Sequence, residues 1–321
     1  MITAVWFLLA VLPPGQASPW PLPYPSSVHL VSTANQLTGE ELLRIGEIHD
    51  HQNHFPETLT YYQLALTTFR TSKQPRGIAT ALVKIAKVRE RQGKVQEAYV
   101  ALQEALPILA RSPDRLAYAQ TLLIMGRVST RLGNMEVAEK SLTQAITHFD
   151  SVKERNGRNE ALIQLGLLQV SDGLTEQGLS SLQQGREDAR ARGDRDQQLA
   201  AAVALGNAQW LLDREKDARP YYEDGLRLAE AERNIPAQAI LRLRIAQLDA
   251  EYDRLAEGIE AGKQALLLSQ TLRDSVTEAA TLSVLADLYR KAGRTAEAEE
   301  SAQRALSIYR HRQIFVHAAG L

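Results

Sequence analysis

The sequence of 321 residues contains no cysteine. This absence excludes disulfide bonds, thiolate nucleophiles and cysteine-ligated metal sites. Net charge is also almost absent, because 37 Lys and Arg residues face 38 Asp and Glu residues. Proteins that bind nucleic acid through its phosphates normally carry a clear basic excess, so we expect no nucleic-acid partner. Apolar residues make up 44% of the chain, which is enough to build a core.

The first 39 residues contain no Lys, Arg, Asp or Glu. Their apolar run at residues 4–12, AVWFLLAVL, is too short to span a bilayer, which takes about 20 residues. Its length is typical of a signal-peptide core, and Gly15 and Ala17 supply the small residues of a cleavage site, although no basic residue precedes the run. We predict a signal peptide over 1–17 and an exported protein, periplasmic or secreted. The alternative is a cytoplasmic protein with an uncleaved apolar leader.

A proline-rich segment follows the predicted signal peptide. Proline occupies every second position from Pro19 to Pro25. Because proline fixes φ and donates no backbone hydrogen bond, the pattern predicts an extended linker over 18–37.

The remainder of the chain repeats with a period of 40 residues. Each copy has a small residue after an aliphatic one, at Gly46, Ala86, Gly126, Gly166, Gly206, Ala246 and Ala286. Two further columns, twelve and nineteen residues later, also hold Gly or Ala, with Thr58 as the one exception. Since Gly inside a helix costs about 1 kcal/mol against Ala, the recurrence indicates close approach of helix backbones.

Two loops interrupt each repeat. A column of Gly, Asn and Asp at 53, 93, 133, 173, 213, 253 and 293 predicts a tight turn between a first and a second helix. Asp114, Asp194, Asn234 and Asp274 follow the second helices and are predicted N-caps of the next first helix.

Apolar residues between these loops are spaced by three and four, which indicates helices, and no strand is indicated. A single helix pair cannot bury its own apolar face, whereas stacked pairs can. We therefore predict an all-α fold of seven antiparallel helix pairs over 38–311, followed by a short tail at 312–321.

The repeat resembles the tetratricopeptide repeat. The seventh copy, LADLYRKAGRTAEAEESAQRAL at 285–306, shows the family pattern most completely. The period exceeds the usual 34 residues, and the family's helix-ending proline is absent. The long form is similar to the repeats of kinesin light chains and of bacterial regulators with 40-residue repeats. The resemblance implies a right-handed α-solenoid superhelix whose concave groove takes a peptide or helix.

The resemblance also implies which residues line that groove. Carried onto this sequence they are Arg44, Glu47, Lys84, Lys87, Arg127, Leu167, Val170, Asn207, Trp210, Gln247, Asp287 and Arg290. The early part is basic, the middle apolar and the late part polar. We therefore expect a ligand with an acidic segment for Lys84, Lys87 and Arg127 and an apolar anchor near Trp210. Asn207 and Gln247 are expected to bond the ligand backbone.

The alternative interpretation of these positions is structural. On that view the charged residues form a solvated face and Trp210 packs between repeats. The aliphatic column that begins at Leu43 is interpreted as helix packing.

The functional hypothesis is a protein-interaction scaffold without catalytic activity, cofactor or metal. The alternative is a regulatory repeat module for an effector carried on another chain. The segment HDHQNH at 49–54 suggests a metal site, but His49 and His51 lie about 200° apart on a helix and do not converge. No HExxH, phosphate-loop, GxSxG or paired-carboxylate motif is present. Residues 314–316, Ile-Phe-Val, could cap the array or support self-association through the C-terminal end.

Overall fold

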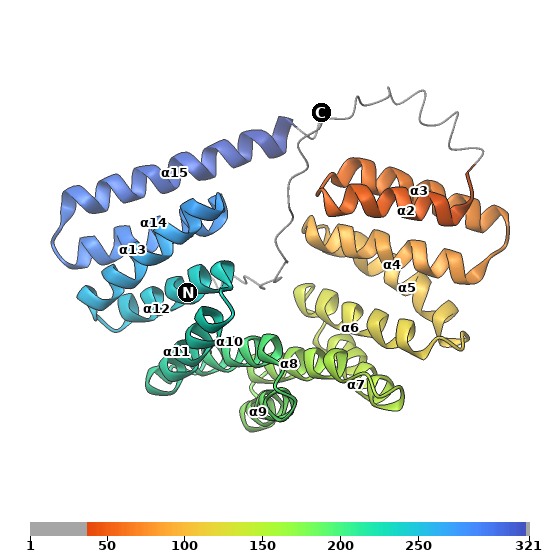
Figure 1. Cartoon of the computed structure of the whole chain (residues 1–321), viewed down its shortest axis with the longest axis horizontal. Coiled ribbons are helices and arrows are strands. Elements are labelled where there is room, and N and C mark those ends of the chain that lie inside the picture. The colour runs from red at the N-terminus through yellow and green to blue at the C-terminus, as the bar shows by residue number, and fades with distance from the viewer. Residues whose placement is uncertain (1–36, 319–321) are drawn as a thin grey trace. The chain divides into compact units, whose positions relative to one another are not determined.

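Fourteen consecutive helices make up residues 37–318, the part that the computed structural model describes (Figure 1). Side chains are described through Arg310. The helices are α2 (Gly39–His51), α3 (Phe55–Thr71), α4 (Pro75–Arg91), α5 (Val95–Ala110), α6 (Arg115–Arg131), α7 (Met135–Ser151), α8 (Arg155–Ser171), α9 (Thr175–Ala191), α10 (Arg195–Leu211), α11 (Glu215–Ala231), α12 (Ile235–Glu251), α13 (Leu255–Leu272), α14 (Ser275–Lys291) and α15 (Thr295–Ala318). No strand occurs between residues 37 and 318. The predicted signal peptide, and the predicted linker up to residue 36, lie outside the described residues.

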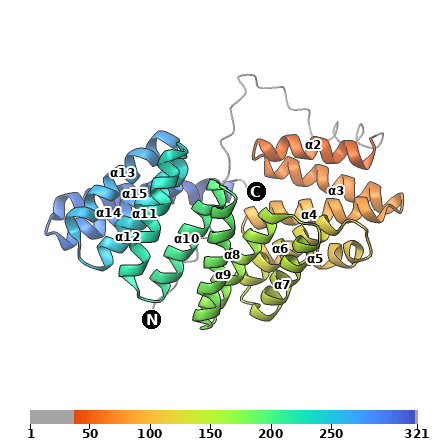
Figure 2. The ribbon, with the colours of Figure 1, turned by 60° about the horizontal axis from the view of Figure 1, so that its bottom comes forward.

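The helices belong to two compact units. Along the chain, the boundary between the units falls between Leu168 and Gln169, within α8. In the first unit α2 packs on α3, α4 on α5 and α6 on α7. In the second unit α10 packs on α11, α12 on α13 and α14 on α15 (Figure 1 and Figure 2). Second helices also contact the first helix of the next pair, as α3 contacts α4 and α11 contacts α12. The all-α solenoid fold is confirmed, while the hand of the superhelix stays a prediction.

The predicted turn between paired helices is confirmed in every repeat. All seven positions have a positive φ, including the non-glycine residues Asn53, Asp213 and Asp253 at 57–59°. At the end of α4, Gly93 has φ 76°, which lets the Lys94 N–H donate to the Arg89 carbonyl at 2.9 Å. Left-handed backbone at this position satisfies carbonyls that the helix end would otherwise leave without a donor.

The four predicted N-caps are also confirmed. Asp114 accepts a hydrogen bond from the Ala117 N–H at 3.0 Å. The side chains of Asp194, Asn234 and Asp274 cap α10, α12 and α14 in the same way. A capping box of Thr38 and Glu41 begins α2 and was not predicted. These caps separate the helix pairs at defined residues, which keeps the 40-residue register.

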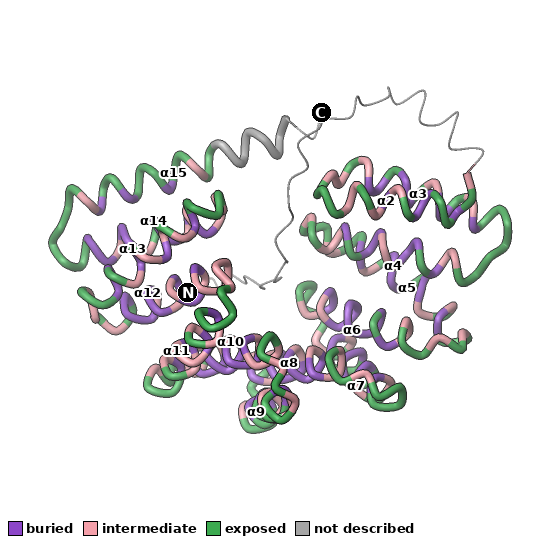
Figure 3. The backbone as a smooth tube through the Cα atoms, in the orientation of Figure 1, coloured by how far each residue is buried: buried purple, intermediate pink, exposed green. Residues whose placement is uncertain are grey.

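The small-residue columns mark close approach between the two helices of a pair. A Cβ built on Gly46 would lie 2.4 Å from the Tyr62 ring, and one on Gly206 would lie 2.6 Å from the Tyr222 ring. Both tyrosines are buried at 1% or less. In both pairs the side of the first helix that faces its partner is therefore filled by a ring from the second helix, and buried and exposed residues alternate along the helices (Figure 3).

The last helix differs from the expectation. We expected it to end near Arg310 and to be followed by a tail, but α15 continues through Ala318. Residues 311–319 contain no Gly, Pro, Asn or Asp that would favour a turn, and the next Gly is Gly320. The predicted tail is thus largely an extension of the helix, and Ile314, Phe315 and Val316 lie on that extension.

Candidate functional site

The predicted groove residues all lie on the first helices of their pairs. They are distributed over α2, α4, α6, α8, α10, α12 and α14. Val170 is 4% exposed, so its side chain belongs to the core and cannot contact a ligand in this structure. The others are exposed or half-buried. Seven of these eleven fall into two sets, one in each unit.

The surface in the first unit, called the Lys87 surface here, is covered with ion pairs. Its residues are Glu47, Lys84, Lys87, Glu90, Arg127 and Glu160. Lys84 Nζ lies 2.6 Å from a carboxylate oxygen of Glu47. The Arg127 guanidinium donates two hydrogen bonds to the Glu90 carboxylate, of 2.9 and 3.2 Å, and a third to Glu160, of 2.7 Å. Bidentate pairing of this kind holds a guanidinium in one orientation.

Lys87 is the exception on this surface. It is exposed and makes no ion pair among the residues that the structure describes. Desolvation by its surroundings, and then repulsion from Lys84 and Arg127, lower the pKa of the Lys87 ammonium. The expected basic segment of Lys84, Lys87 and Arg127 therefore contains one unpaired cation, since the other two are neutralised by carboxylates.

The surface in the second unit, called the Trp210 surface here, joins α10 to α12. Its residues are Asn207, Trp210 and Leu211 of α10 and Arg244, Gln247 and Glu251 of α12. The indole nitrogen of Trp210 donates to the Glu251 carboxylate, and the Arg244 guanidinium lies 5.9 Å from the ring centroid. Trp210 is half-buried, so it both packs between repeats, as the structural interpretation expected, and keeps part of its surface open.

Two amide side chains flank the indole. The carbonyl oxygen of Asn207 accepts a hydrogen bond from the Tyr222 hydroxyl at 2.8 Å, and that of Gln247 accepts one from Arg244 at 3.0 Å. Neither amide nitrogen has a hydrogen-bond partner in the described part of the chain. The scaffold thus orients both amides so that their N–H donors remain available.

Sequence reasoning missed Leu211 as part of this surface. Leu211 is 59% exposed beside Trp210. Every other repeat has a charged or polar residue at the corresponding position, from His51 to Lys291. The apolar exception was visible in the repeat alignment, and it extends the exposed apolar area near the indole.

The remaining predicted positions contribute less. Asp287 and Arg290 form an exposed pair at 3.1 Å within one turn of α14, and such pairs stabilise little. Arg44 is exposed on α2 and Leu167 is half-buried on α8.

The histidine-rich segment forms a packed helix end. The His49 ring stacks on Tyr61 with ring centroids 5.3 Å apart and planes 9° apart. Within residues 37–310, no group of three or more His, Asp or Glu side chains is arranged to hold a metal ion.

None of the described helices combines the length and the apolar character needed to cross a bilayer.

Comparisons with known proteins agree with this fold. The tetratricopeptide repeat family model matches residues 77–151 and 237–311. No curated protein matches the sequence. Among solved structures, the chain is similar to the aspartyl phosphate phosphatase F from Bacillus subtilis, with a TM-score of 0.65 at 11% identity, covering 88% of this chain and 74% of that one.

Two further structures share the architecture. The Rap conjugation gene regulator of the plasmid pLS20, solved in complex with a Phr peptide, has a TM-score of 0.60 at 17% identity, covering 87% of this chain and 76% of that one. A signal transduction ATPase with a tetratricopeptide repeat sensor from Pyrococcus horikoshii has a TM-score of 0.59 at 16% identity, covering 87% of this chain and 42% of that one. These identities establish likeness of fold. The two matches of the family model show tetratricopeptide repeats over residues 77–151 and 237–311, and the other helix pairs of the described chain share their small-residue pattern and turns.

Proposed function

We propose that this chain is a protein-interaction scaffold that binds a peptide or helical segment of a partner on the exposed side of its first helices. The observation that carries the proposal is the Trp210 surface, where an indole, an exposed leucine and two unused amide donors lie together. Trp is among the residues that most often dominate binding energy at interfaces. The two amide donors match the carbonyl oxygens of a peptide backbone.

The ligand chemistry follows from both surfaces. An apolar side chain of the ligand packs on Trp210 and Leu211, while its backbone accepts hydrogen bonds from Asn207 and Gln247. A carboxylate of a ligand binds at Lys87, because that ammonium forms no ion pair within the described residues, and the attraction of Glu160 and Glu90 is weaker than the burial and repulsion that lower its pKa. An acidic group there also relieves the repulsion that Lys87 experiences from Lys84 and Arg127.

Structural relatives support a peptide as the ligand. The pLS20 regulator was solved with a Phr peptide, and another Rap protein was solved with the competence and sporulation factor. Those ligands belong to those proteins, and they show what this architecture can hold.

A second candidate function is regulation of an effector on another chain. The Pyrococcus protein carries its repeats as the sensor of a larger ATPase, and this chain corresponds to 42% of its length. On this proposal the same first-helix surfaces bind the effector. The two candidate functions differ in one measurable respect. A regulatory module changes the activity of the partner that it binds, whereas a scaffold does not.

We further propose that the chain is not itself an enzyme, although one structural neighbour is named a phosphatase. The strongest pKa shifts support this view. Burial raises the pKa of both Tyr62 and Tyr222, and these hydroxyls lie in different units, each packed inside its own helix pair.

Export and self-association remain proposals as well. Export is supported by the apolar run at 4–12, and an isolated protein that retains Met1 would contradict it. Self-association through α15 is supported by Tyr309, which is 43% exposed although the corresponding residue of every earlier repeat is buried at 4% or less. Sedimentation of the wild type and of Tyr309→Ser tests it, since an unchanged monomer in both contradicts the proposal.

Selection from a displayed peptide library tests the scaffold proposal directly. Peptides enriched on the wild-type protein should bind the Trp210→Ala variant roughly 30-fold more weakly, as expected for a hot-spot loss of about 2 kcal/mol. Leu267→Ala is the matched control, because Leu267 is 65% exposed on the second helix α13. Equal affinity for the wild type and Trp210→Ala would reject this surface as the site.

A further inference from the structure

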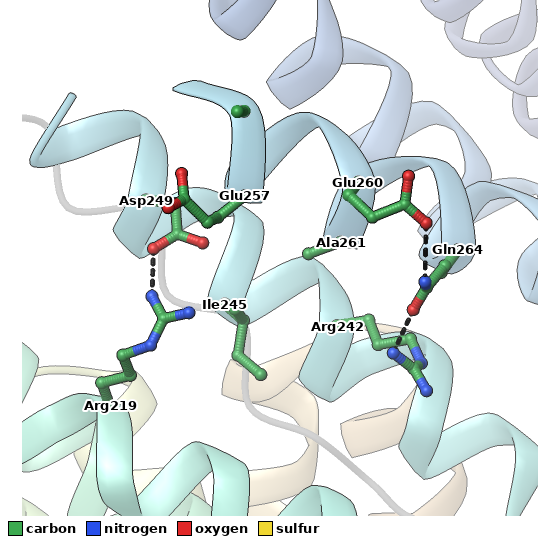
Figure 4. A pocket seen from close by; sticks show the side chains of 9 residues that line it. Arg219, Arg242, Ile245, Asp249, Glu257, Glu260, Ala261 and Gln264 are labelled. Carbon is green, nitrogen blue, oxygen red and sulfur yellow. Dashed lines mark hydrogen bonds and ion pairs between the residues drawn. The ribbon is translucent and has the colours of Figure 1, made fainter. Parts of the chain in front are cut away.

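A pocket of about 530 Å³ lies in the second unit, between the second helices α11 and α13 and over the first helix α12 (Figure 4). Its floor contains Ile245 of α12 and Ala261 of α13. It occupies the opposite side of α12 from the Trp210 surface, because Ile245 and Gln247 are about 200° apart around the helix. The pocket is therefore separate from the proposed peptide site.

Charged residues replace core residues around this pocket. The position of Arg242 is occupied in the other six repeats by Leu or Ala residues that are all 5% exposed or less. Asp249 is the only carboxylate in its own repeat column. At the position of Arg242, the junction of the fifth and sixth repeats thus contains a charged side chain where the other six repeats contain an apolar one. The small side chains of Ala256 and Ala261 leave space beside these charged groups.

Asp249 is the fully buried carboxylate of this pocket. Its side chain is 0% exposed, and one carboxylate oxygen accepts from Arg219 and, at 2.9 Å, from Arg254. The other oxygen, Oδ2, is buried without a hydrogen-bond partner. A buried carboxylate oxygen without a donor is costly, so its presence points to a missing donor.

The charge balance of the pocket favours a cation as that donor. Arg219 is bonded to Asp249 and Glu223, and Arg242 to Glu230 and Gln264, so both guanidinium groups are already paired. By contrast, Glu257 and Glu260 have no ion pair within the described residues, and Glu260 accepts only from Gln264.

The two ends of the pocket differ in their acceptors. Figure 4 shows Asp249 and Glu257 toward one end of the pocket and Gln264 toward the other, with Ile245 between the two ends. Adjacent carboxylates repel one another unless a cation lies between them. Glu257 is exposed, so its side chain is free to change rotamer when a cation enters the pocket.

We propose that this pocket binds an aliphatic chain ending in a guanidinium or ammonium group. The cation lies against Asp249 and Glu257, and the aliphatic chain packs on Ile245 and Ala261. The volume is within the range of small-ligand sites. The cation can come from a basic side chain of a peptide or from a free amine, and the two sources share this chemistry.

Calorimetric titration of the full chain tests the proposal with three probes. They are agmatine, the capped peptide acetyl-Gly-Arg-Gly-amide, and the neutral acetyl-Gly-Gln-Gly-amide. We expect saturable binding of agmatine or of the arginine peptide, weakened by added salt, and no binding of the neutral peptide. Binding of the arginine peptide alone assigns the site to a protein partner, and binding of agmatine alone assigns it to a free amine.

Two variants locate the binding in the pocket. Glu257→Gln should weaken the bound probe at least about fivefold by removing one carboxylate. Ala261→Leu should weaken it by filling the pocket while every charge is kept. Glu176→Gln is the matched control, since Glu176 also lies in the first turn of a second helix of the same unit. The proposal is overturned if neither cationic probe binds, or if binding is the same in the wild type and in both pocket variants.

Discussion

The ring of Phe69 occupies the space that a side chain at Gly77 would need. A Cβ on Gly77 would lie 2.3 Å from the ring, and one on Gly39 would lie 2.4 Å from it. Phe69 is on the second helix α3, and Gly77 lies in the first turn of the next first helix, α4. The same relationship recurs one pair of repeats later between Phe149 and Gly157. Stacking between neighbouring repeats is thus matched in size at these two junctions.

Gly77→Ala should destabilise the protein by about 1–2 kcal/mol, because overpacking outweighs the gain in helix propensity. The following repeat has Leu109 and Ala117 at the corresponding positions. Adding Phe69→Leu to Gly77→Ala should therefore recover part of the loss. Urea unfolding of both single variants and the double variant measures the coupling, and simple additivity would contradict the size match.

The ion-pair network of the Lys87 surface should contribute to stability through Arg127. Arg127→Ala leaves Glu90, whose side chain is 13% exposed, without its bidentate partner, and we expect a loss of about 2 kcal/mol. Arg290→Ala serves as the control, because its pair with Asp287 is exposed and should matter by less than about 0.5 kcal/mol. Thermal unfolding of both variants compares them. Equal effects would show that burial does not distinguish the two pairs.

Lys87 should lower stability while it is charged. The folded-state pKa of Lys87 is below its ordinary value of 10.5, so the folded protein disfavours the proton relative to the unfolded chain. The penalty is fully present below the folded pKa and disappears as pH rises through that value toward 10.5. Lys87→Gln should therefore raise the melting temperature at pH 7 and raise it less at pH values near 10.5.

Lys140→Gln provides the comparison for this pH series, since Lys140 is exposed on the second helix α7. Effects common to all variants at high pH cancel in the difference. A Lys87→Gln variant that is no more stable than the wild type at pH 7 would contradict the expected repulsion.

The loops between repeats contain non-glycine residues with a positive φ, a backbone conformation that is unfavourable for residues with a side chain. Arg233 has φ 52°, whereas the corresponding residue of the preceding repeat is Gly193, with φ 67°. Arg233→Gly should stabilise the protein by about 0.5–1 kcal/mol, and Gly193→Arg should destabilise it by a similar amount. Equilibrium unfolding of the two reciprocal variants checks both signs. Effects of the same sign would exclude backbone conformation as the cause.

The sequence predicted part of the Trp210 surface but not the ion pairs of the Lys87 surface. Trp210, Asn207 and Gln247 were identified from their repeat columns and lie together across α10 and α12. The basic segment was predicted from Lys84, Lys87 and Arg127, but a column does not show which carboxylates of a neighbouring helix reach each cation. Only the packed structure reveals that Glu47, Glu90 and Glu160 neutralise two of the three.

The sequence by itself determined the helices, their turns and their caps. These features depend on residues close together in the chain, such as the left-handed turn at Gly93 and the N-cap at Asp114, and a constant period repeats them. Tertiary structure alone decided which charges are paired and where a pocket opens. Those outcomes depend on side chains from three helices meeting at one place, as Arg219, Asp249 and Glu257 do, and no interval along the chain encodes that distance.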